Sequence, residues 1–295
     1  MSPEHEAWIR AHVEPSGPIE WPHEAPWSVV LRVPTRSGVI WFKENVAPLA
    51  YEAAVVQVLA ERMPDRVAEL VAVDTERGWI LMRDAGTRLR ELPDSKADWL
   101  AILPRYAELQ LAVVPEVDRL LGGGTPDRRV ATLPRLFREL VEEEATALGA
   151  DDLHGLRELA HRLDEACPAL SSIGVPESIQ HDDFHDGNVF VDGGRYRFVD
   201  WGDCCVSHPF ATLRIPFEGI VETTGWSLAE LRDAYLEPFT GLATRSELLQ
   251  AYDHAWLVAG VTRALKWAPL VDALPKPHRW TDAVPLRLRI LLGES

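Results

Sequence analysis

The chain has 295 residues, which is long enough for two lobes with separate cores or for one large domain. Its content of 46% hydrophobic and 26% charged residues is ordinary for a folded protein, and no apolar stretch approaches the roughly 20 residues that cross a bilayer. The formal net charge of −16 disfavours nucleic acids and anionic membranes as partners and attracts cations; it is consistent either with a role in solubility alone or with a cationic substrate.

The first residues, 1–6, are acidic and polar and have no feature of a secretory signal, so we expect a cytoplasmic location. The three cysteines are Cys167, Cys204 and Cys205. An odd number with one adjacent pair fits neither a disulfide framework nor a Cys-x-x-Cys metal site. We therefore expect three reduced, structural thiols.

Up to about residue 86, short β-type runs dominate the sequence. Residues 27–33 and 39–43 flank a turn that contains proline and glycine, which predicts a β-hairpin. Pro48 opens a stretch with apolar residues at helical spacing. Residues 70–73 and 79–82 are the next predicted strands. The expected order is strand, strand, helix, strand, strand.

After Gly86 the pattern becomes helical. Asp94 or Ser95 can cap a helix with one broad apolar face that extends to Leu109. Further helices are predicted at residues 134–148, 153–166, 227–236, where Ser227 and Glu230 have capping-box spacing, and 247–267. We therefore predict an α+β chain with a small β-rich lobe, residues 1–85, and a larger, mainly helical lobe, residues 86–295.

Residues 178–203 interrupt the helical pattern. Within them, residues 189–191 and 196–199 predict a hairpin around the turn Asp192-Gly193-Gly194. A polar, acid-rich loop lies at each chain end of this hairpin. We therefore expect the side chains of Asp183, Asn188 and Asp200 to lie near one another.

The spacing of these residues is typical of phosphoryl transfer, which needs a carboxylate near the acceptor hydroxyl, oxygen ligands for magnesium and a cation on the phosphates. His-x-Asp-x-x-x-x-Asn is a kinase catalytic-loop pattern, with the aspartate as base and the asparagine as magnesium ligand. It occurs here from His181 to Asn188, with Asp183 at the base position. A second metal carboxylate should begin an Asp-x-Gly after the hairpin, and Asp200 does so.

On these residues the chain resembles the aminoglycoside phosphotransferase and choline kinase-like family, whose members are bacterial relatives of protein kinases. The resemblance covers nearly the whole chain and is sharpest in residues 178–210. It implies a two-lobed, protein-kinase-like fold and an ATP- and Mg²⁺-dependent kinase that phosphorylates a small molecule. It also implies that Asp183 is the catalytic aspartate, that Asn188 and Asp200 bind magnesium, and that His181 stabilises the loop.

The smaller lobe contains two further residues of this pattern. A kinase-like lobe has a lysine at the end of its third strand, which holds the α- and β-phosphates, and a glutamate on the next helix, which orients the lysine. Lys43 and Glu52 occupy these places. Residues 79–86 resemble the family's hinge, which implies that Met82, Arg83 and Ala85 bind adenine, through the Arg83 carbonyl and the Ala85 amide.

The sequence departs from the family pattern in two places. Asp182 stands where the family usually has glycine, and register assigns Asp183 as the base because it lies five residues before Asn188 and two after His181. Asp182 itself is expected to cap a turn or to approach the acceptor. Residues 22–28 contain prolines and no glycine, so no glycine-rich phosphate loop is predicted there.

The sequence has three alternative interpretations besides a small-molecule kinase. His181, Asp182 and His185 allow a metal-dependent hydrolase, although no distant histidine completes such a site. A non-catalytic nucleotide-binding relative is a second alternative, although every catalytic position of the motif is retained. A protein kinase is disfavoured because residues 207–210 follow Asp200 too closely for a peptide-docking activation segment.

The acceptor is less well defined. Acidic side chains that could bind a cationic acceptor are Asp203, Glu218, Glu222, Asp233 and Asp253, and aromatic ones are Trp201, Trp256 and Trp267. With the charge of −16 they favour an amino sugar, an aminoglycoside or an amino alcohol, and a neutral sugar remains open. We expect a monomer or a homodimer.

Overall fold

The computed structural model describes residues 1–276 and 278–293. Residues 1–93, 122–125 and 186–202 form one compact unit, and the described residues of 94–121, 126–185 and 203–295 form another. We call these the first and the second unit. The division predicted at residues 85 and 86 remains a prediction about lobes.

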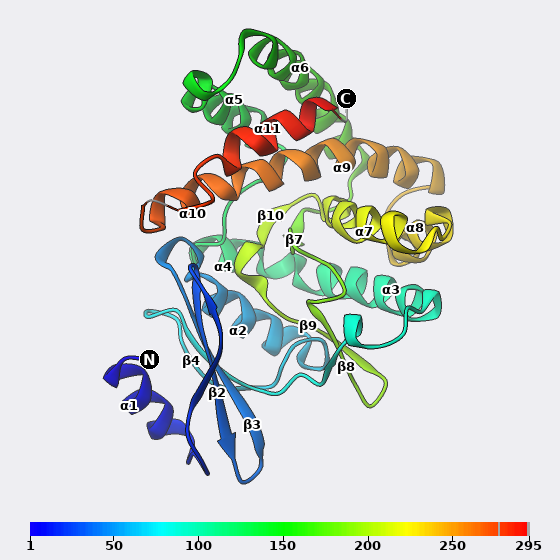
Figure 1. Cartoon of the computed structure of the whole chain (residues 1–295). Helices are drawn as coiled ribbons and strands as arrows, with labels where there is room; N and C mark the ends of the chain where they lie inside the picture. Colours follow the sequence, from blue (N-terminus) through cyan, green and yellow to red (C-terminus); the bar gives the residue numbers. More distant parts are fainter. Residues whose placement is uncertain (277, 294–295) are drawn as a thin grey trace. The chain divides into compact units, whose positions relative to one another are not determined.

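The first unit contains a five-stranded antiparallel sheet in the order β1-β2-β3-β5-β4; its strands β2, β3 and β4 are labelled in Figure 1. Its strands are β1 (Glu20–Ala25), β2 (Ser28–Thr35), β3 (Gly38–Asn45), β4 (Leu70–Asp74) and β5 (Trp79–Arg83), and its helices are α1 (Pro3–His12) and α2 (Glu52–Arg62). The predicted hairpin, the helix after it and the two following strands are confirmed. Helix α1 and strand β1 were not predicted from the sequence. The serine-proline pair at residues 2 and 3 was the available signal for α1, because Ser2 caps the helix and Pro3 opens it.

Alternation along β3 gives this sheet two different faces. Phe42 points to one face and packs against α1, where its ring lies 5.0 Å from His5 and 5.9 Å from Trp8. Ile9, Leu31 and Trp79 belong to the same core cluster. Because successive side chains of a strand point to opposite faces, Lys43 projects to the other side, toward α2. A buried sheet therefore fixes the direction of Lys43.

A second sheet of the first unit has the order β6-β8-β9, with β6 (Thr87–Arg88), β8 (Val189–Asp192) and β9 (Arg195–Phe198). β8 and β9 form the predicted hairpin, with Val189 opposite Phe198. The two turn residues Gly193 and Gly194 have φ of 56° and 80°. Positive φ at both positions is the geometry of a two-residue hairpin turn, which glycine adopts without steric cost.

The second unit is mainly helical. Its helices are α3 (Lys96–Val113), α4 (Val117–Gly122, which ends in the first unit), α5 (Leu133–Glu143), α6 (Ala150–Ile173), α7 (Arg214–Thr224), α8 (Leu228–Leu236), α9 (Arg245–Leu265), α10 (Trp267–Ala273) and α11 (Ala283–Gly293). A short ladder pairs β7 (Ser178–Gln180) with β10 (Cys205–Ser207). Among the described residues, no helix has the length and apolar character of a bilayer span.

Two helix starts differ in detail from the sequence prediction. Ser227 does precede α8, but its side chain makes no capping bond, and Glu230 accepts a hydrogen bond from Lys96 of α3 instead. The capping box of this region is at the start of α9, where Thr244 and Glu247 cap each other's backbone amides. The Thr-x-x-Glu spacing of these two residues indicates this helix start in the sequence, but it was not used to predict it.

Candidate functional site

The first unit brings Lys43, Glu52 and Asp200 into direct contact. The Lys43 Nζ atom lies 2.6 Å from Glu52 Oε2 and 2.5 Å from Asp200 Oδ1. Burial would lower the pKa of Lys43, but the neighbouring charges of Asp200 and Glu52 outweigh it and hold the pKa above its ordinary value. The lysine is therefore a permanent cation held between two carboxylates.

Glu52 is almost completely buried, at 2% exposure, and its carboxylate has hydrogen-bond partners besides Lys43. It also accepts hydrogen bonds from Asn45 Nδ2 at 2.5 Å and from the Trp201 amide at 2.9 Å. Burial raises the pKa of Glu52 in spite of the opposing charge of Lys43. Glu52 therefore fastens the segment after β9 to α2. Asn45 was missed in the sequence, although it lies two residues after Lys43 and so on the same face of β3.

Asn188 and Asp200 lie next to the two strands of the β8–β9 hairpin, at the same end. The Val199 amide donates to the Asn188 carbonyl at 3.0 Å, which places Asp200 one residue beyond that pair. Asp200 has a φ of 66°, and its side chain is 55% exposed. Left-handed backbone at a non-glycine residue is uncommon and often occurs at functional positions. The hairpin thus brings the backbone of Asn188 close to that of Asp200; the Asn188 side chain is buried, and the Asp200 carboxylate is exposed.

The residues predicted to bind adenine also belong to the first unit. Met82 and Arg83 are at the end of β5, where the Arg83 amide donates to the Glu69 carbonyl at 2.8 Å. Ala85 is buried, and its carbonyl accepts a hydrogen bond from Arg197 at 3.1 Å. Arg197 is on β9, so the end of β5 is tied to the hairpin that carries Asp200.

The predicted catalytic loop lies in the second unit and is anchored by aromatic packing. His181 and Phe184 are both fully buried. The Phe184 ring stacks on Tyr106 of α3, with centroids 4.2 Å apart, and the His181 amide donates to the Tyr106 hydroxyl at 3.1 Å. Anchors on both sides of Asp183 restrict the backbone of the loop.

Asp183 itself lies near His185, Lys266 and His181. His185 Nε2 lies 3.3 Å from its Oδ2, and Lys266, which follows α9, acts on it electrostatically. Burial would raise the pKa of Asp183, but His185, Lys266 and His181 outweigh it and bring the pKa below its ordinary value. The carboxylate is therefore ionised at neutral pH. Lys266 was not identified from the sequence, because a lysine at the end of a helix gives no local indication that it contacts Asp182 and Asp203.

Asp182 was expected to cap a turn or to approach the acceptor, but its side chain is instead buried inside the second unit. It is 2% exposed, and its carboxylate accepts hydrogen bonds from Arg128 at 3.2 Å and from Gln180 and Thr262 at 3.4 Å each. Burial raises the pKa of Asp182 to about 6, against the charges of Lys266 and Arg128. The side chain is thus an internal ion-pair partner, and its φ of 55° shows why a glycine suits this position.

The expected acceptor residues have varied environments. In the second unit Asp203 pairs with Lys266 at 2.8 Å, Glu218 pairs with Arg214 and Arg263, and Asp233 pairs with Arg232 and Arg245. Asp253 and Glu222 are exposed, Trp256 lies under Arg214, and Trp267 stacks on Trp280 with centroids 5.3 Å apart. Trp201, in the first unit, is fully buried and donates to the Phe198 carbonyl, so its ring is not accessible to an acceptor.

The three cysteines are buried and free, as expected. Burial raises the pKa of both Cys167 and Cys205 to about 12, so these thiols are protonated. Among the described residues, no three histidine, cysteine or acidic side chains converge as a metal-binding group.

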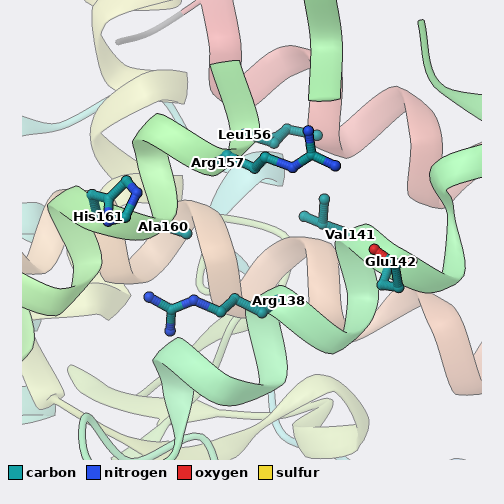
Figure 2. A pocket seen from close by; sticks show the side chains of 7 residues that line it. All are labelled: Arg138, Val141, Glu142, Leu156, Arg157, Ala160 and His161. Atoms are coloured by element: carbon teal, nitrogen blue, oxygen red, sulfur yellow. The ribbon is translucent and has the colours of Figure 1, made fainter. Parts of the chain in front are cut away.

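A cavity of about 260 Å³ lies in the second unit (Figure 2). It is formed by residues of α5 and α6: Arg138, Val141, Glu142, Leu156, Arg157, Ala160 and His161. None of these is a predicted site residue. The cavity therefore gives no reason to move the candidate site away from the two clusters around Asp200 and Asp183.

The sequence matches the family described as "Phosphotransferase enzyme family" over residues 21–248. This range includes both clusters described above. No curated protein sequence matches the chain.

Solved structures with a similar fold cover nearly the whole chain. A choline/ethanolamine kinase family protein from Mesorhizobium loti is 16% identical, with 99% of this chain and 95% of that chain covered and a TM-score of 0.62. An ethanolamine kinase from Plasmodium vivax is 14% identical, with 96% and 85% covered and a TM-score of 0.65. An amicoumacin kinase in complex with AMP-PNP, Ca²⁺ and Ami is 13% identical, with 100% and 94% covered and a TM-score of 0.57. The chain therefore has the protein-kinase-like α+β fold.

Proposed function

This chain belongs to the phosphotransferase enzyme family, and we propose that it is a kinase that transfers the γ-phosphoryl group of ATP, with Mg²⁺, to a hydroxyl group of a small molecule. The observation that carries the proposal is the contact of Lys43 with both Glu52 and Asp200. Lys43 and Asp200 are 157 residues apart in sequence. An ion pair between the predicted phosphate-binding lysine and the predicted metal ligand supports the kinase assignment more strongly than either motif alone.

For the nucleotide, we propose that Lys43 holds the α- and β-phosphates. Glu52 fixes the direction of the lysine, and the buried Asn45 fixes Glu52 in turn. We further propose that the Arg83 carbonyl and the Ala85 amide bind adenine, with Met82 beside them. In this proposal residues 1–85 bind the nucleotide, and residues 86–295 carry the catalytic loop and bind the acceptor.

The side chains of Asn188 and Asp200 fit a magnesium ion. Mg²⁺ prefers oxygen ligands and is bound in such enzymes by one or two protein groups together with phosphates and water. The exposed Asp200 carboxylate and the neighbouring Asn188 amide supply such oxygens. A bound Mg²⁺ would neutralise the charge that develops on the phosphates. The amicoumacin kinase of similar fold was solved with a nucleotide analogue and Ca²⁺, which is consistent with a divalent ion.

For the acceptor, we propose that the Asp183 carboxylate orients the attacking hydroxyl and accepts its proton. Asp183 precedes Asn188 by only five residues in the sequence. Because the pKa of Asp183 is lowered, the carboxylate is a weak base, and it contributes mainly by accepting the hydrogen bond of the hydroxyl. This fits phosphoryl transfer, in which positioning and electrostatic stabilisation supply most of the catalysis.

We propose a hydroxyl compound with an amine as acceptor, that is an amino sugar, an aminoglycoside or an amino alcohol. The net charge of −16 and the exposed Asp253 support a cationic group, and the half-buried Trp267 offers an aromatic surface. Asp203 and Glu218 are already paired with cations, so they would bind an amine only after those pairs rearrange.

The test is a thermal-shift measurement followed by an ADP-release screen over amino sugars, aminoglycosides, choline-like alcohols and hexoses. ATP with Mg²⁺ at about a hundred times its dissociation constant should stabilise the protein by about 2.7 kcal/mol. That corresponds to a melting shift on the order of 5 °C for a chain of this size. Stabilisation by zinc alone would support the hydrolase alternative. Nucleotide stabilisation without ADP release from any acceptor would support a non-catalytic relative.

A further inference from the structure

Cationic side chains gather near the adjacent residues Asp182 and Asp183 in the second unit, although the whole chain is strongly acidic. Two of them have clear partners. Lys266 Nζ donates to Asp203 Oδ2 at 2.8 Å and to the Asp182 carbonyl at 3.3 Å, and Arg128 pairs with the Asp182 carboxylate. The positive charges of Lys266 and Arg128 are balanced by the negative charges of Asp203 and Asp182. These two carboxylates are therefore already paired.

Two further cations, Arg263 and Arg287, come from α9 and α11. The chain turns back through α10, and the two helices lie side by side in antiparallel directions (Figure 1). Gly260 of α9 faces Leu291 of α11 so closely that an added Cβ would lie 2.4 Å from a Leu291 methyl group. Arg263 is about one turn after Gly260, and Arg287 is about one turn before Leu291. This register brings the two arginines to the same level of the helix pair.

The supply of negative charge at this level is too small. Arg263 donates to Glu218 Oε2 at 3.0 Å, but the other oxygen of Glu218 is bound by Arg214 at 2.8 Å. The Nε atom of Arg263 is buried and has no hydrogen-bond partner. Arg287 is half-buried, and no carboxylate among residues 1–276 and 278–293 lies within ion-pair distance of it. Arg214 and Arg263 therefore share the carboxylate of Glu218, and Arg287 forms no ion pair with it.

This arrangement is unfavourable unless an anion completes it. Burial and the charge of Arg263 lower the pKa of Arg287, whereas Glu218, Asp182 and Asp183 act in the opposite direction. Arg287 is thus within electrostatic reach of the catalytic carboxylate. Cations that are partly removed from water and lack a counter-ion cost free energy, and a guanidinium group binds carboxylates and phosphates in a bidentate geometry.

We propose, on the premise of the kinase function above, that Arg287 and Arg263 bind an anionic group of the acceptor, either a carboxylate or a phosphate ester. The acceptor is then a hydroxyl compound that carries a negative charge, with or without an amine. The net charge of −16 does not conflict with this, because the residues nearest to the reacting hydroxyl determine its recognition. An anion on the acceptor also supplies the charge that Glu218 alone cannot.

The test compares acceptors that differ only in the anionic group. Suitable pairs are ethanolamine with L-serine, which adds a carboxylate, and 6-O-methylglucosamine with glucosamine 6-phosphate, which carries a phosphate where the first compound carries a methyl group, so that neither has a free 6-hydroxyl. ADP release is measured for wild type, for Arg287→Gln and for Arg162→Gln, an exposed arginine of α6 that serves as the matched control. The first pair tests the carboxylate as the source of the anion and the second tests the phosphate.

Wild type should prefer the anionic member of at least one pair. Arg287→Gln should raise the KM of that member by about 10- to 100-fold, since a hydrogen-bonded charge contact is lost, and should leave the KM of the non-anionic member unchanged. Arg162→Gln should change neither. Equal or better use of the non-anionic members, with no effect of Arg287→Gln on the ratio, would overturn the proposal.

A binding measurement covers the case in which none of the four compounds is the acceptor. Inorganic phosphate, titrated without nucleotide, should raise the melting temperature of wild type and of Arg162→Gln more than that of Arg287→Gln. No difference between the variants would refute the anion site. Failure of the kinase function gives another pattern: ATP with Mg²⁺ would not stabilise the protein and no acceptor would release ADP, whatever phosphate does.

Discussion

Lys43 lies between two carboxylates of very different exposure, with Nζ 2.6 Å from Glu52 and 2.5 Å from Asp200. The Glu52 side chain is 2% exposed, whereas that of Asp200 is 55% exposed. The two contacts therefore have different consequences. We expect the buried Lys43–Glu52 pair to contribute to the stability of the first unit, and the exposed Asp200 carboxylate to remain available to a ligand.

The first prediction concerns the loss of each partner. Lys43→Met leaves Glu52 as an uncompensated buried charge and should lower the free energy of unfolding by about 3–5 kcal/mol. Asp200→Asn removes an exposed partner and should cost less than about 1 kcal/mol, while it abolishes stabilisation by ATP with Mg²⁺. Urea unfolding with and without nucleotide measures both effects. The double variant with Glu52→Gln should recover part of the loss of Lys43→Met. Equal destabilisation by the two single variants would contradict this account.

A second prediction separates catalysis from nucleotide binding. Asp183→Asn removes the carboxylate that orients the hydroxyl and should reduce kcat by about 10²–10⁴-fold. Stabilisation by ATP with Mg²⁺ should persist, because Lys43, Asn188 and Asp200 are unchanged. Asp186→Asn, three residues further on, is the control, since that carboxylate pairs with Arg90 on the surface. Normal turnover in Asp183→Asn would remove the assigned role.

The third prediction follows from the buried Asp182, whose pKa rises to about 6 from an ordinary value of 3.8. Between these two pH values the folded protein binds more protons at this residue than the unfolded chain. The contribution of Asp182 to stability is therefore unfavourable above pH 6, and it improves as the pH falls toward 4.

Asp182→Asn should abolish this pH dependence, and asparagine also tolerates the left-handed φ of this position. The difference in unfolding free energy between wild type and Asp182→Asn should shift in favour of wild type by up to about 1.4 kcal/mol per pH unit below pH 6. Urea unfolding at pH 7, 6 and 5 measures it, and the subtraction cancels groups common to both proteins. A difference that is constant with pH would mean that the carboxyl does not titrate in this range.

The sequence predicted the parts of the site that depend on local pattern. Lys43 was identified as the lysine at the end of a predicted strand and Glu52 as the glutamate on the next predicted helix, both from the pattern of a kinase-like lobe, and a glycine turn predicted the hairpin before Asp200. It could not predict Asn45 as a partner of Glu52 or Lys266 as a partner of Asp203, because those contacts join segments that only the folded chain brings together.

The same limit applies to Arg263 and Arg287. Each is an ordinary helix residue in sequence, and their shared level follows from the close packing of Gly260 against Leu291. Asp182 is a related case. The sequence indicated an unusual residue at a position typical of glycine, but its partner Arg128 is 54 residues away. Chemistry carried by a motif was therefore predictable, and charge balance between helices was not.

The last prediction concerns the backbone that supports the hairpin. Gly86 has a φ of 110°, and an added Cβ would lie 2.4 Å from the Val191 carbonyl oxygen of β8. The clash is with backbone and cannot be relieved by a side-chain rotation. Gly86→Ala should therefore displace β8, which begins directly after Asn188, and lower the free energy of unfolding by about 2–4 kcal/mol from the overpacking and the backbone strain together.

Gly38→Ala is the matched control for Gly86→Ala. Gly38 has a similar φ of 120°, but an added Cβ there meets nothing within 4 Å. It should therefore cost only the strain of a positive φ, about 1–2 kcal/mol, and leave the affinity for ATP with Mg²⁺ unchanged. Gly86→Ala should lose nucleotide affinity as well, because Asn188 and Asp200 move with the hairpin. If nucleotide titrations show the same affinity for both variants, the position of β8 does not control the proposed metal ligands.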